Sequence, residues 1–244
     1  MVNLHNKTIV ILGATGGIGS SLAEKLSKDG ANLILLGNSD DKLESLRQKL
    51  NGKHIFLKCD LTNDTQIKEL IDKLRSLSQI DCLIHAAGIG VYKNLGEITY
   101  KEWDETFSIN VKSLFTITQS LLTSLERSDL ALVLAIGSGA GVIAMKGRSL
   151  YCSSKFALRG FMLSLAEEYK GKKPQFCLIT LGSTLTPFAG TSVEEKQKQF
   201  KAGRAYFPVE WVSNKITEII KKEQRGVEYL WYPGDYGFGT WKKP

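Results

Sequence analysis

Seven short runs of hydrophobic residues recur along the chain, and longer amphipathic stretches separate them. The runs cover residues 8–13, 32–37, 54–59, 81–88, 130–137, 176–182 and 227–232. Most of them are continuously apolar, which is typical of parallel strands that are buried on both faces of a sheet. The pattern therefore predicts seven strands of one parallel sheet.

The stretches between these runs carry apolar residues at helical spacing, as Ile18, Leu22 and Leu26 do after the first run. We expect helices near residues 18–29, 40–50, 65–78, 100–126, 150–170 and 208–224. Regular alternation of strand and helix predicts an α/β fold with a doubly wound, Rossmann-type, seven-stranded parallel sheet and helices on both faces. No linker or repeat interrupts the alternation, so residues 1–244 are expected to form a single domain.

Composition and charge narrow the classes of function. The net charge is +7, but the basic residues are scattered and show no aromatic interleaving, so we do not expect nucleic-acid binding. No apolar run approaches the length of a membrane span and the N-terminus lacks a signal-peptide pattern, so we expect no membrane association and a cytoplasmic location. The four cysteines form no CxxC pair and the three histidines show no ligand spacing, so we expect reduced thiols and no metal site.

The segment GATGGIG, residues 13–19, lies between the first predicted strand and the first predicted helix. Its glycines permit a tight turn and a close approach of a ligand, and the helix N-terminus offers N–H groups and a positive dipole end to a phosphate. The spacing differs from GxGxxG, but the position after the first strand favours dinucleotide binding. The expected cofactor contacts in this turn are Gly13, Thr15, Gly16, Gly17, Ile18 and Gly19.

The residues after the second predicted strand bear on the choice between NAD and NADP. An acid at this strand end binds the ribose hydroxyls and favours NAD. Here Gly37, Asn38 and Ser39 precede the first acid, Asp40, so no carboxylate repels a 2′-phosphate. Asn38 and Ser39 can donate hydrogen bonds to it, and the sequence favours NADP over NAD. The alternative that Ser39 and Lys42 only form a turn stays open, and neither position 37 nor position 38 holds an arginine.

Polar and small residues also follow the third and fourth predicted strands. Asp60 stands at the carboxyl end of the third, where it can meet a ligand or merely cap the next helix. The fourth strand ends in HAAG, where Ala87 and Gly88 are small enough for a cofactor to lie against the backbone. Asn110 lies beside the apolar face of the helix predicted at 100–126, where its amide needs partners. It is either a functional residue or a hydrogen-bonded core asparagine.

Ser138 stands at the carboxyl end of the fifth predicted strand, and the pentapeptide YCSSK follows at residues 151–155. Tyr151 and Lys155 are four apart and share one face of a helix. A phenol beside an ammonium is either ordinary helix surface or an acid tuned to move a proton. The joint position of these three residues after the cofactor half of the sheet favours the second interpretation.

In this order the motifs GATGGIG, CDLT, HAAG, SIN, GSGAG, YCSSK and LGSTLT resemble those of the compact, single-domain short-chain dehydrogenase/reductases. The resemblance extends over nearly the whole chain. It implies that Asn110, Ser138, Tyr151 and Lys155 are the catalytic tetrad. It also implies cofactor contacts from Asp60 at the adenine, Leu61, Ala87, Gly88, Tyr151, Lys155, the backbone around Thr184 and the hydroxyl of Thr186. The chain departs from the family pattern at Leu12, His85, Ala86 and Leu181.

The expected reaction is NADPH-dependent reduction of a ketone or 3-oxoacyl carbonyl of a small molecule to an alcohol. Tyr151 is the expected proton donor, and we expect Lys155 to lower the pKa of its phenol. The resemblance adds that Lys155 binds the nicotinamide ribose, Ser138 orients the substrate oxygen and Asn110 holds a water molecule. The alternatives are an NAD-dependent alcohol or sugar dehydrogenase and a non-catalytic NADP-binding regulator of the same fold.

Residues 187–207 are where the family carries its substrate lid, and this segment has mixed charge and no clear pattern. We expect a partly apolar substrate wall from Val91, Tyr92, Met145, Phe188, Tyr206 and Phe207. The basic residues Lys93, Lys146, Arg148 and Arg204 either attract an acidic substrate or are solvated surface. From the resemblance we expect a homodimer or homotetramer assembled through the helix that carries YCSSK and the one that carries Asn110.

Overall fold

The structure, a computed structural model, describes residues 1–240. Within them, seven parallel strands form one sheet in the order β3-β2-β1-β4-β5-β6-β7. The strands are β1 (Thr8–Leu12), β2 (Asn32–Gly37), β3 (Ile55–Lys58), β4 (Cys82–His85), β5 (Leu132–Ile136), β6 (Gln175–Leu181) and β7 (Glu228–Trp231). All seven predicted strands are confirmed. The chain reverses its direction of winding between β1 and β4, and ligands of such sheets bind at the carboxyl ends of the strands beside this switch point.

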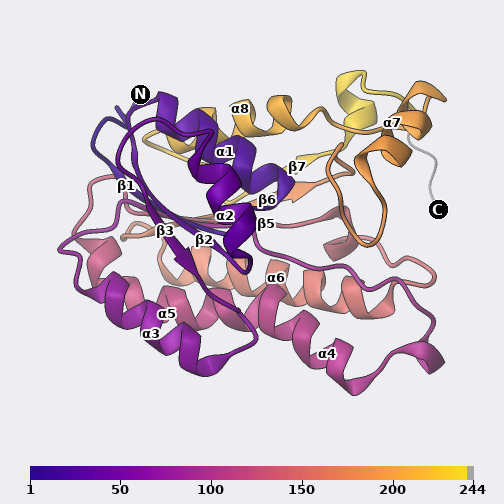
Figure 1. The fold of residues 1–244 in the computed structure, drawn as a ribbon, viewed down its shortest axis with the longest axis horizontal. Coiled ribbons are helices and arrows are strands. Elements are labelled where there is room, and N and C mark those ends of the chain that lie inside the picture. Colours follow the sequence, from indigo (N-terminus) through magenta and orange to yellow (C-terminus); the bar gives the residue numbers. More distant parts are fainter. Residues whose placement is uncertain (241–244) are drawn as a thin grey trace.

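Helices cover both faces of the sheet (Figure 1). On one face lie α1 (Gly17–Lys28), α2 (Asp40–Arg47) and α8 (Val209–Ile220), and on the other lie α3 (Asp64–Arg75), α4 (Tyr100–Phe107), α5 (Ser113–Glu126) and α6 (Ser149–Glu168). Helix α7 (Val193–Lys201) lies in the segment expected to be a lid. The doubly wound α/β architecture predicted from the sequence is confirmed.

The core explains why the strands read as continuous apolar runs. Along β1, Ile9 and Ile11 join the hydrophobic cluster under α1 and α8. Their neighbours Val10 and Leu12 join the cluster under α3, α5 and α6. Because successive side chains of a strand point to opposite faces, a strand covered on both faces must be apolar at every position.

Two local features differ from the predicted elements. The single helix expected at 100–126 is interrupted by a π-helical turn, Ser108–Lys112, with Asn110 at its centre. Helix α7 lies where no helix was predicted. Its sequence VEEKQKQFK buries no residue, so it has no apolar stripe for periodicity to detect. Ser192 begins it by accepting a hydrogen bond from the Glu195 amide.

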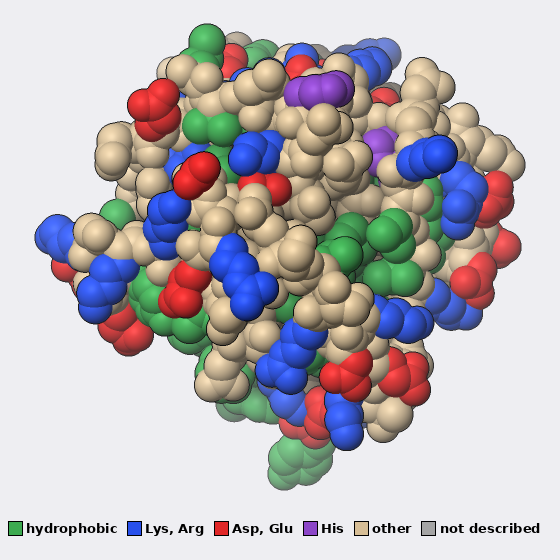
Figure 2. All heavy atoms as spheres, turned by 90° about the vertical axis from the view of Figure 1, so that its left-hand side faces the viewer, with side chains coloured by type: hydrophobic (Ala, Val, Ile, Leu, Met, Phe, Trp, Pro, Cys, Tyr) green, Lys and Arg blue, Asp and Glu red, His purple; other side chains and the backbone are tan. Residues whose placement is uncertain are grey.

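The surface charges are mixed. On the face at the left of Figure 1, lysine and arginine side chains are interspersed with acidic ones (Figure 2). In the part of the chain that the structure describes, no helix is both long and apolar enough to cross a bilayer.

Candidate functional site

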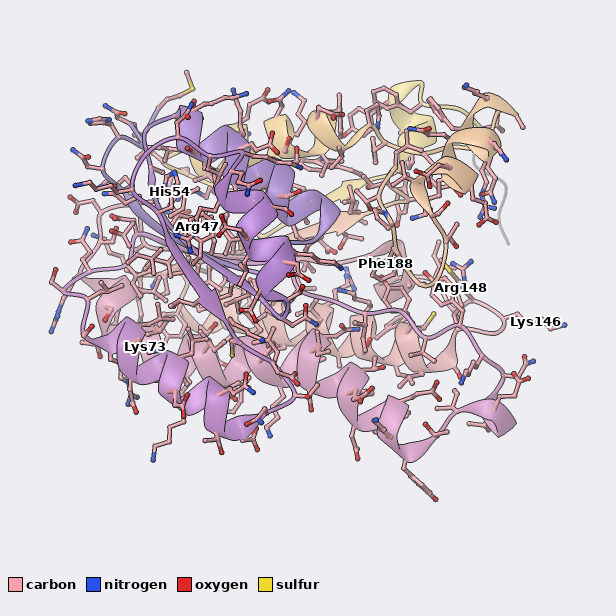
Figure 3. The ribbon with its side chains drawn as sticks, in the orientation of Figure 1. Arg47, His54, Lys73, Lys146, Arg148 and Phe188 are labelled. Carbon is pink, nitrogen blue, oxygen red and sulfur yellow. The ribbon has the colours of Figure 1, made fainter. Side chains whose placement is uncertain are left out.

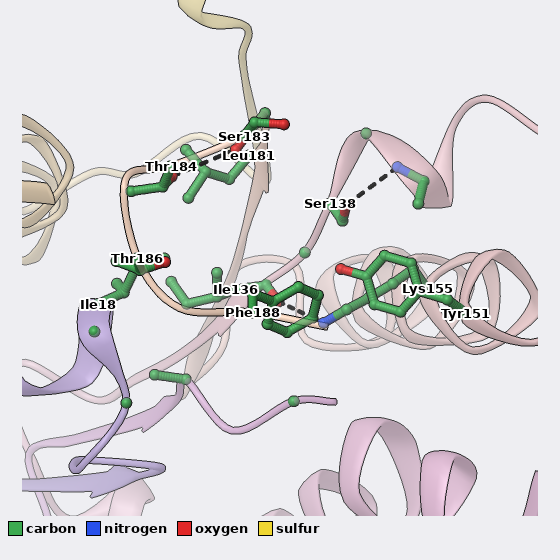
Figure 4. A pocket seen from close by; sticks show the side chains of 18 of the residues that line it. Ile18, Ile136, Ser138, Tyr151, Lys155, Leu181, Ser183, Thr184, Thr186 and Phe188 are labelled. Carbon is green, nitrogen blue, oxygen red and sulfur yellow. Dashed lines mark hydrogen bonds between the residues drawn. The ribbon is translucent and has the colours of Figure 1, made fainter. Parts of the chain in front are cut away.

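A cavity of about 260 Å³ opens at the carboxyl ends of the strands. Its walls come from the turn after β1, the loops after β4, β5 and β6, the start of α6 and the lid segment. Figure 4 shows Tyr151, Lys155 and Ser138 on one side of this space, and Ile18 and Thr186 on the other. The predicted residues that line it are Gly16, Gly17, Ile18, Ala87, Gly88, Ser138, Tyr151, Lys155, Thr184 and Thr186. Gly13, Thr15, Gly19, Asn38, Ser39, Asp60, Leu61 and Asn110 are not part of its lining.

The glycine turn is shaped by close backbone approaches. Gly13 has φ +78, and a Cβ there would lie 2.6 Å from backbone atoms of Ala87. A Cβ on Gly19 would lie 2.2 Å from the carbonyl oxygen of Gly13. One on Gly17 would lie 2.3 Å from the Thr186 side chain, across the mouth of the turn. Gly13 therefore lets the turn pack against the backbone that follows β4, Gly19 lets the turn fold tightly on itself, and Gly17 opens the start of α1 towards the cavity.

The residues after β2 lie beyond the cavity. The Ser39 side chain caps α2 by accepting a hydrogen bond from the Lys42 amide, at 3.4 Å. Asp40 accepts a hydrogen bond from Lys58 at the end of β3, and this bond raises the pKa of the lysine. Thr15 contacts Gly37, where a Cβ would lie 2.6 Å from the threonine methyl. The contact of Thr15 with Gly37 joins the turn after β1 to the end of β2.

Asp60 organises the loop after β3 and does not cap α3. Its carboxylate accepts hydrogen bonds from the amide and the hydroxyl of Thr62, at 2.9 and 2.8 Å. Asn63 is the cap, because its side chain accepts from the Thr65 and Gln66 amides. Leu61 packs against the hydrophobic cluster beneath this loop.

Tyr151 and Lys155 lie on the first turns of α6, and both are buried, with exposed fractions of 6% and 4%. The ammonium of Lys155 donates to the Ile136 carbonyl at 3.1 Å and lies 5.9 Å from the centre of the Tyr151 ring. Burial lowers the pKa of Lys155 to about 8, since a charged amine is poorly solvated there. The structure thus brings these two side chains to one wall of the cavity.

The pKa of Tyr151 corrects one prediction. Burial raises it, and a hydrogen bond with the Ser138 side chain opposes part of that shift. The expected lowering by Lys155 is wrong for this structure, because the ammonium points to the Ile136 carbonyl and the low-polarity surroundings disfavour a phenolate. Tyr151 is consequently a neutral phenol at neutral pH, able to donate a proton.

Asn110 is fully buried, and both the oxygen and the nitrogen of its amide are hydrogen-bonded. Its Oδ1 accepts from the Ile89 amide at 2.9 Å, and its Nδ2 donates to the Ile89 carbonyl at 3.0 Å and to Ser154 Oγ at 2.9 Å. Asn110 therefore ties the loop after β4 to α6. Ser154 passes the link on by donating to the Tyr151 carbonyl at 2.8 Å.

His85 supplies a second link around the π-helical turn. It is fully buried, and its Nε2 lies 3.0 Å from Ser113 Oγ, which in turn donates to the Ile109 carbonyl at 2.8 Å. Burial lowers the pKa of His85 to about 3, so the imidazole is neutral. At the position where the chain departs from the family motif, a histidine thus connects β4 to the turn that carries Asn110.

The expected substrate wall is only partly formed. Tyr92, Met145 and Phe188 line the cavity, and the rings of Tyr92 and Phe188 both lie 5.6 Å from the Tyr151 ring. Phe207 does not belong to the wall. It is fully buried in the core and stacks on Trp211 with ring centres 4.5 Å apart. Val91 and Tyr206 do not line the cavity either.

Of the four basic residues singled out in the sequence, only Arg148 lines the cavity. Lys93 is bonded to Glu102, and Lys146 is exposed and points outwards (Figure 3). Arg204 donates to Gln199 at 3.0 Å.

Lys196 is a further cation of the cavity that the sequence did not predict, because it lies on the helix that periodicity does not reveal. Its ammonium donates to the carbonyls of Thr184 and Thr186, at 3.3 and 2.7 Å. Burial lowers its pKa to about 8. Lys196 thereby fastens the lid helix to the loop after β6.

Comparison with known proteins identifies the family and several relatives of similar sequence. The sequence model described as short chain dehydrogenase matches residues 7–197. A 3-oxoacyl-(acyl-carrier-protein) reductase FabG of Rickettsia bellii is 30% identical over 168 residues, which cover 69% of this chain and 68% of the relative. An NAD-dependent glycerol dehydrogenase of Listeria innocua is 27% identical, covering 85% and 84%. The chain spans only 18% of the glycine betaine reductase ATRR of Emericella nidulans, with 28% identity over 91% of this chain.

Solved structures agree on the fold. An alcohol dehydrogenase from the archaeon Thermococcus sibiricus, complexed with 5-hydroxy-NADP, superposes with a TM-score of 0.84. It is 23% identical, and the match covers 98% of this chain and 99% of that one. A serine dehydrogenase complexed with NADP⁺ gives a TM-score of 0.82 at 22% identity, covering 93% and 95%. At this identity the likeness concerns the fold.

Proposed function

The chain belongs to the short chain dehydrogenase family of oxidoreductases, and we propose that it is an NADPH-dependent reductase that converts a ketone or 3-oxoacyl carbonyl to an alcohol. One observation carries the proposal: a buried, neutral phenol, Tyr151, is bonded to Ser138 in the cavity onto which the glycine turn opens. A neutral phenol beside a developing alkoxide is the acid that carbonyl reduction needs.

The residues present fit a dinucleotide. Gly16, Gly17 and Ile18 bring the N-terminus of α1 to the cavity, and the Cβ positions of Gly13 and Gly19 are filled by neighbouring backbone. Such a turn accepts a diphosphate through its N–H groups and the helix dipole. When bound, the nicotinamide supplies the hydride. Ala87, Gly88 and Thr186 line the space beyond the turn and would hold the nicotinamide half.

The protein's own groups then handle the proton and the substrate oxygen. Tyr151 donates its proton to the oxygen on which negative charge develops, and Ser138 holds that oxygen by a hydrogen bond. Lys155 keeps a positive charge in the same cavity and would bind the ribose hydroxyls of the cofactor. The Oδ1 atom of Asn110 has a second lone pair, which can accept a hydrogen bond from a water molecule. Oδ1 and the Lys155 ammonium both lie close to Gly88, at 3.4 and 3.5 Å from the position that a Cβ would take there.

The preference for NADP over NAD is supported by the end of β2. Gly37, Asn38 and Ser39 carry no charge, and the carboxylate of Asp40 is bonded to Lys58, which balances its repulsion of a 2′-phosphate. Fluorescence titration with NADPH and NADH tests the preference. NADPH must bind more tightly. An equal or tighter affinity for NADH would favour the alternative, an NAD-dependent alcohol or sugar dehydrogenase, and one relative is named as NAD-dependent.

A panel of ketones, 3-oxoacyl thioesters and sugars, assayed with NADPH and NADH in parallel, tests the reaction. We expect NADPH oxidation with at least one carbonyl class. NADPH binding without turnover on any of them would instead support the non-catalytic regulator. The four residues Asn110, Ser138, Tyr151 and Lys155 argue against that alternative, since binding alone does not require the phenol.

We also propose a homodimer or homotetramer that uses the exposed face of α5 and α6. Phe115 and Phe156 are 45% and 44% exposed on these helices, and Phe115 contacts Phe161 edge to face. Light scattering on the purified protein tests the assembly, and replacing both phenylalanines with serine should release monomers. The cytoplasmic location and the single-domain organisation remain predictions.

A further inference from the structure

The described residues that line the cavity include three cations and no aspartate, glutamate or histidine. The cations are Arg148, Lys155 and Lys196. Lys155 donates to the Ile136 carbonyl on the wall of Tyr151, and Lys196 donates to two carbonyls of the loop after β6, which faces the glycine turn. Arg148 lies at the start of α6, beside the aromatic residues. It is therefore the cation on the side left for the substrate.

The guanidinium of Arg148 is held in place but has few hydrogen-bond acceptors. Its central carbon lies 4.2 Å above the ring of Tyr92, and one N–H donates to the Met145 sulfur at 3.4 Å, which is a weak acceptor. No carboxylate of residues 1–240 pairs with it. The stacked face is covered by the ring, so the donors at the edge remain available. A planar fork of this kind matches a carboxylate bidentately.

The ring of Tyr92 connects this cation to the reaction centre. It contacts Arg148 on one side and lies 5.6 Å from the Tyr151 ring on the other. Arg148 and Phe188, the second ring against Tyr151, line the same cavity, whereas Lys146 extends outwards (Figure 3). The positive charge of Arg148 also acts on the Tyr151 phenol, whose pKa it pulls down against the effect of burial. A small molecule can therefore reach both groups at once.

We infer that the substrate carbonyl compound carries a carboxylate, as a short oxo acid does, and that Arg148 binds this carboxylate while Tyr151 protonates the carbonyl oxygen. The inference rests on the proposed reduction and adds its substrate class. A carrier-linked acyl thioester fits less well, because it carries no carboxylate beside its reducible carbonyl. Lys93 cannot replace Arg148, since Glu102 already neutralises it.

The test compares two substrates that share a carbonyl and differ in charge, a short 3-oxo acid and its methyl ester. Their kcat/KM values with NADPH are measured for the wild type, Arg148→Gln and Lys146→Gln, the control two residues away. We expect the wild type to prefer the acid. In Arg148→Gln, kcat/KM on the acid should fall about 10- to 100-fold, mainly through a higher KM, while kcat/KM on the ester should change little. This is the size of effect expected when one charge-assisted hydrogen bond is lost. Lys146→Gln should behave as the wild type.

Equal activity of the wild type on acid and ester, or an equal loss on both in Arg148→Gln, would overturn the inference. A preference for 3-oxoacyl thioesters over the free acid would overturn it as well. If neither compound is reduced, the proposed reaction fails. Calorimetric titration of the acid into the NADP⁺-loaded protein then tests the carboxylate site independently of the reaction. Binding that Arg148→Gln abolishes and Lys146→Gln keeps supports the carboxylate site, and absent binding in the wild type overturns it.

Discussion

The two sides of the cavity are built from different parts of the chain. On the cofactor side, the turn after β1 consists of glycine backbone that packs against Ala87. A Cβ on Gly13 would lie only 2.6 Å from the Ala87 backbone. On the substrate side, Tyr92, Phe188 and Arg148 enclose the phenol of Tyr151 with side chains from separate loops. A surface made of backbone accepts a single shape, whereas a surface made of side chains can be changed without disturbing the fold. The cofactor side should therefore tolerate almost no substitution, and the substrate side should set selectivity.

The largest expected effect lies where the two sides meet. Tyr151→Phe removes the proton donor and leaves the ring, so turnover should fall by a factor on the order of 10²–10⁴. NADPH affinity should change little, because the glycine turn is untouched. Steady-state kinetics on a confirmed substrate and fluorescence titration measure the two quantities. Tyr100→Phe, at an exposed tyrosine, is the control. Near-normal turnover in Tyr151→Phe would remove Tyr151 from the mechanism.

On the cofactor side, Gly13→Ala should damage both folding and binding. The residue has φ +78, and the new methyl would meet the Ala87 backbone, which cannot move as a flexible side chain does. Strain and overpacking together should cost on the order of 3 kcal/mol of unfolding free energy. Thermal unfolding with and without NADPH measures the loss, and NADPH should stabilise the variant less than the wild type.

The matched control is Gly160→Ala in α6. Its Cβ would meet nothing within 4 Å, so the alanine should stabilise the helix, by about 1 kcal/mol. If Gly13→Ala were as stable as the wild type, the steric account of the turn would be wrong.

Raising the pH should weaken cofactor binding. Lys155 and Lys196 both have a pKa lowered to about 8 by burial. Each is therefore charged below pH about 8 and neutral above it, and an anionic cofactor binds the charged form more tightly. The NADPH dissociation constant should therefore rise between pH 7 and pH 9. Each of the two lysines can contribute up to about a tenfold rise per pH unit above its pKa.

Fluorescence titrations at pH 7, 8 and 9 measure this slope. Lys196→Gln should make it shallower, whereas Lys198→Gln, on the same helix but outside the cavity lining, should leave it unchanged. The same slope in Lys196→Gln as in the wild type would show that this lysine does not sense the cofactor.

The smallest expected effect concerns the end of β2. Asp40→Asn removes a negative charge near the proposed 2′-phosphate position and frees Lys58, so NADPH should bind a few-fold more tightly while NADH is unaffected. The effect is small because both side chains are largely exposed and screened by solvent. Asp41→Asn is the neighbouring control. If NADH bound more tightly as well, the effect of Asp40 would not be directed at the 2′-phosphate, which NADH lacks.

The backbone side of the cavity was also the easier one to predict from the sequence. The apolar run of β1 and the glycine turn follow from local patterns, because Gly13 and Ile9 act through their own backbone and burial. The environment of Tyr151 could not be predicted that way. Burial raises its pKa, and the rings of Tyr92 and Phe188, which pack on Tyr151 from distant loops, are part of those surroundings.

Other misses have physical reasons of the same kind. Phe207 has an apolar aromatic side chain that would suit a substrate wall, yet its ring stacks on Trp211 in the core. Only tertiary packing decides whether such a side chain lies in the wall or in the core. The role of Ser154 depends on a hydrogen bond from Asn110, which lies 44 positions earlier. Helix α7 carries no buried residue and so leaves no hydrophobic signal.

The π-helical turn at Ser108–Lys112 has a consequence for how this protein tolerates changes in length. An α-helix advances about 100° of rotation per residue, so a wide turn amounts to one inserted residue absorbed without breaking the helix. Deleting a single residue from this turn should give an unbroken α-helix that runs straight from α4 into α5. Every side chain on one half would then rotate relative to the other, and Asn110 could no longer face both Ile89 and Ser154. At this point the number of residues, as much as their identity, is under functional constraint.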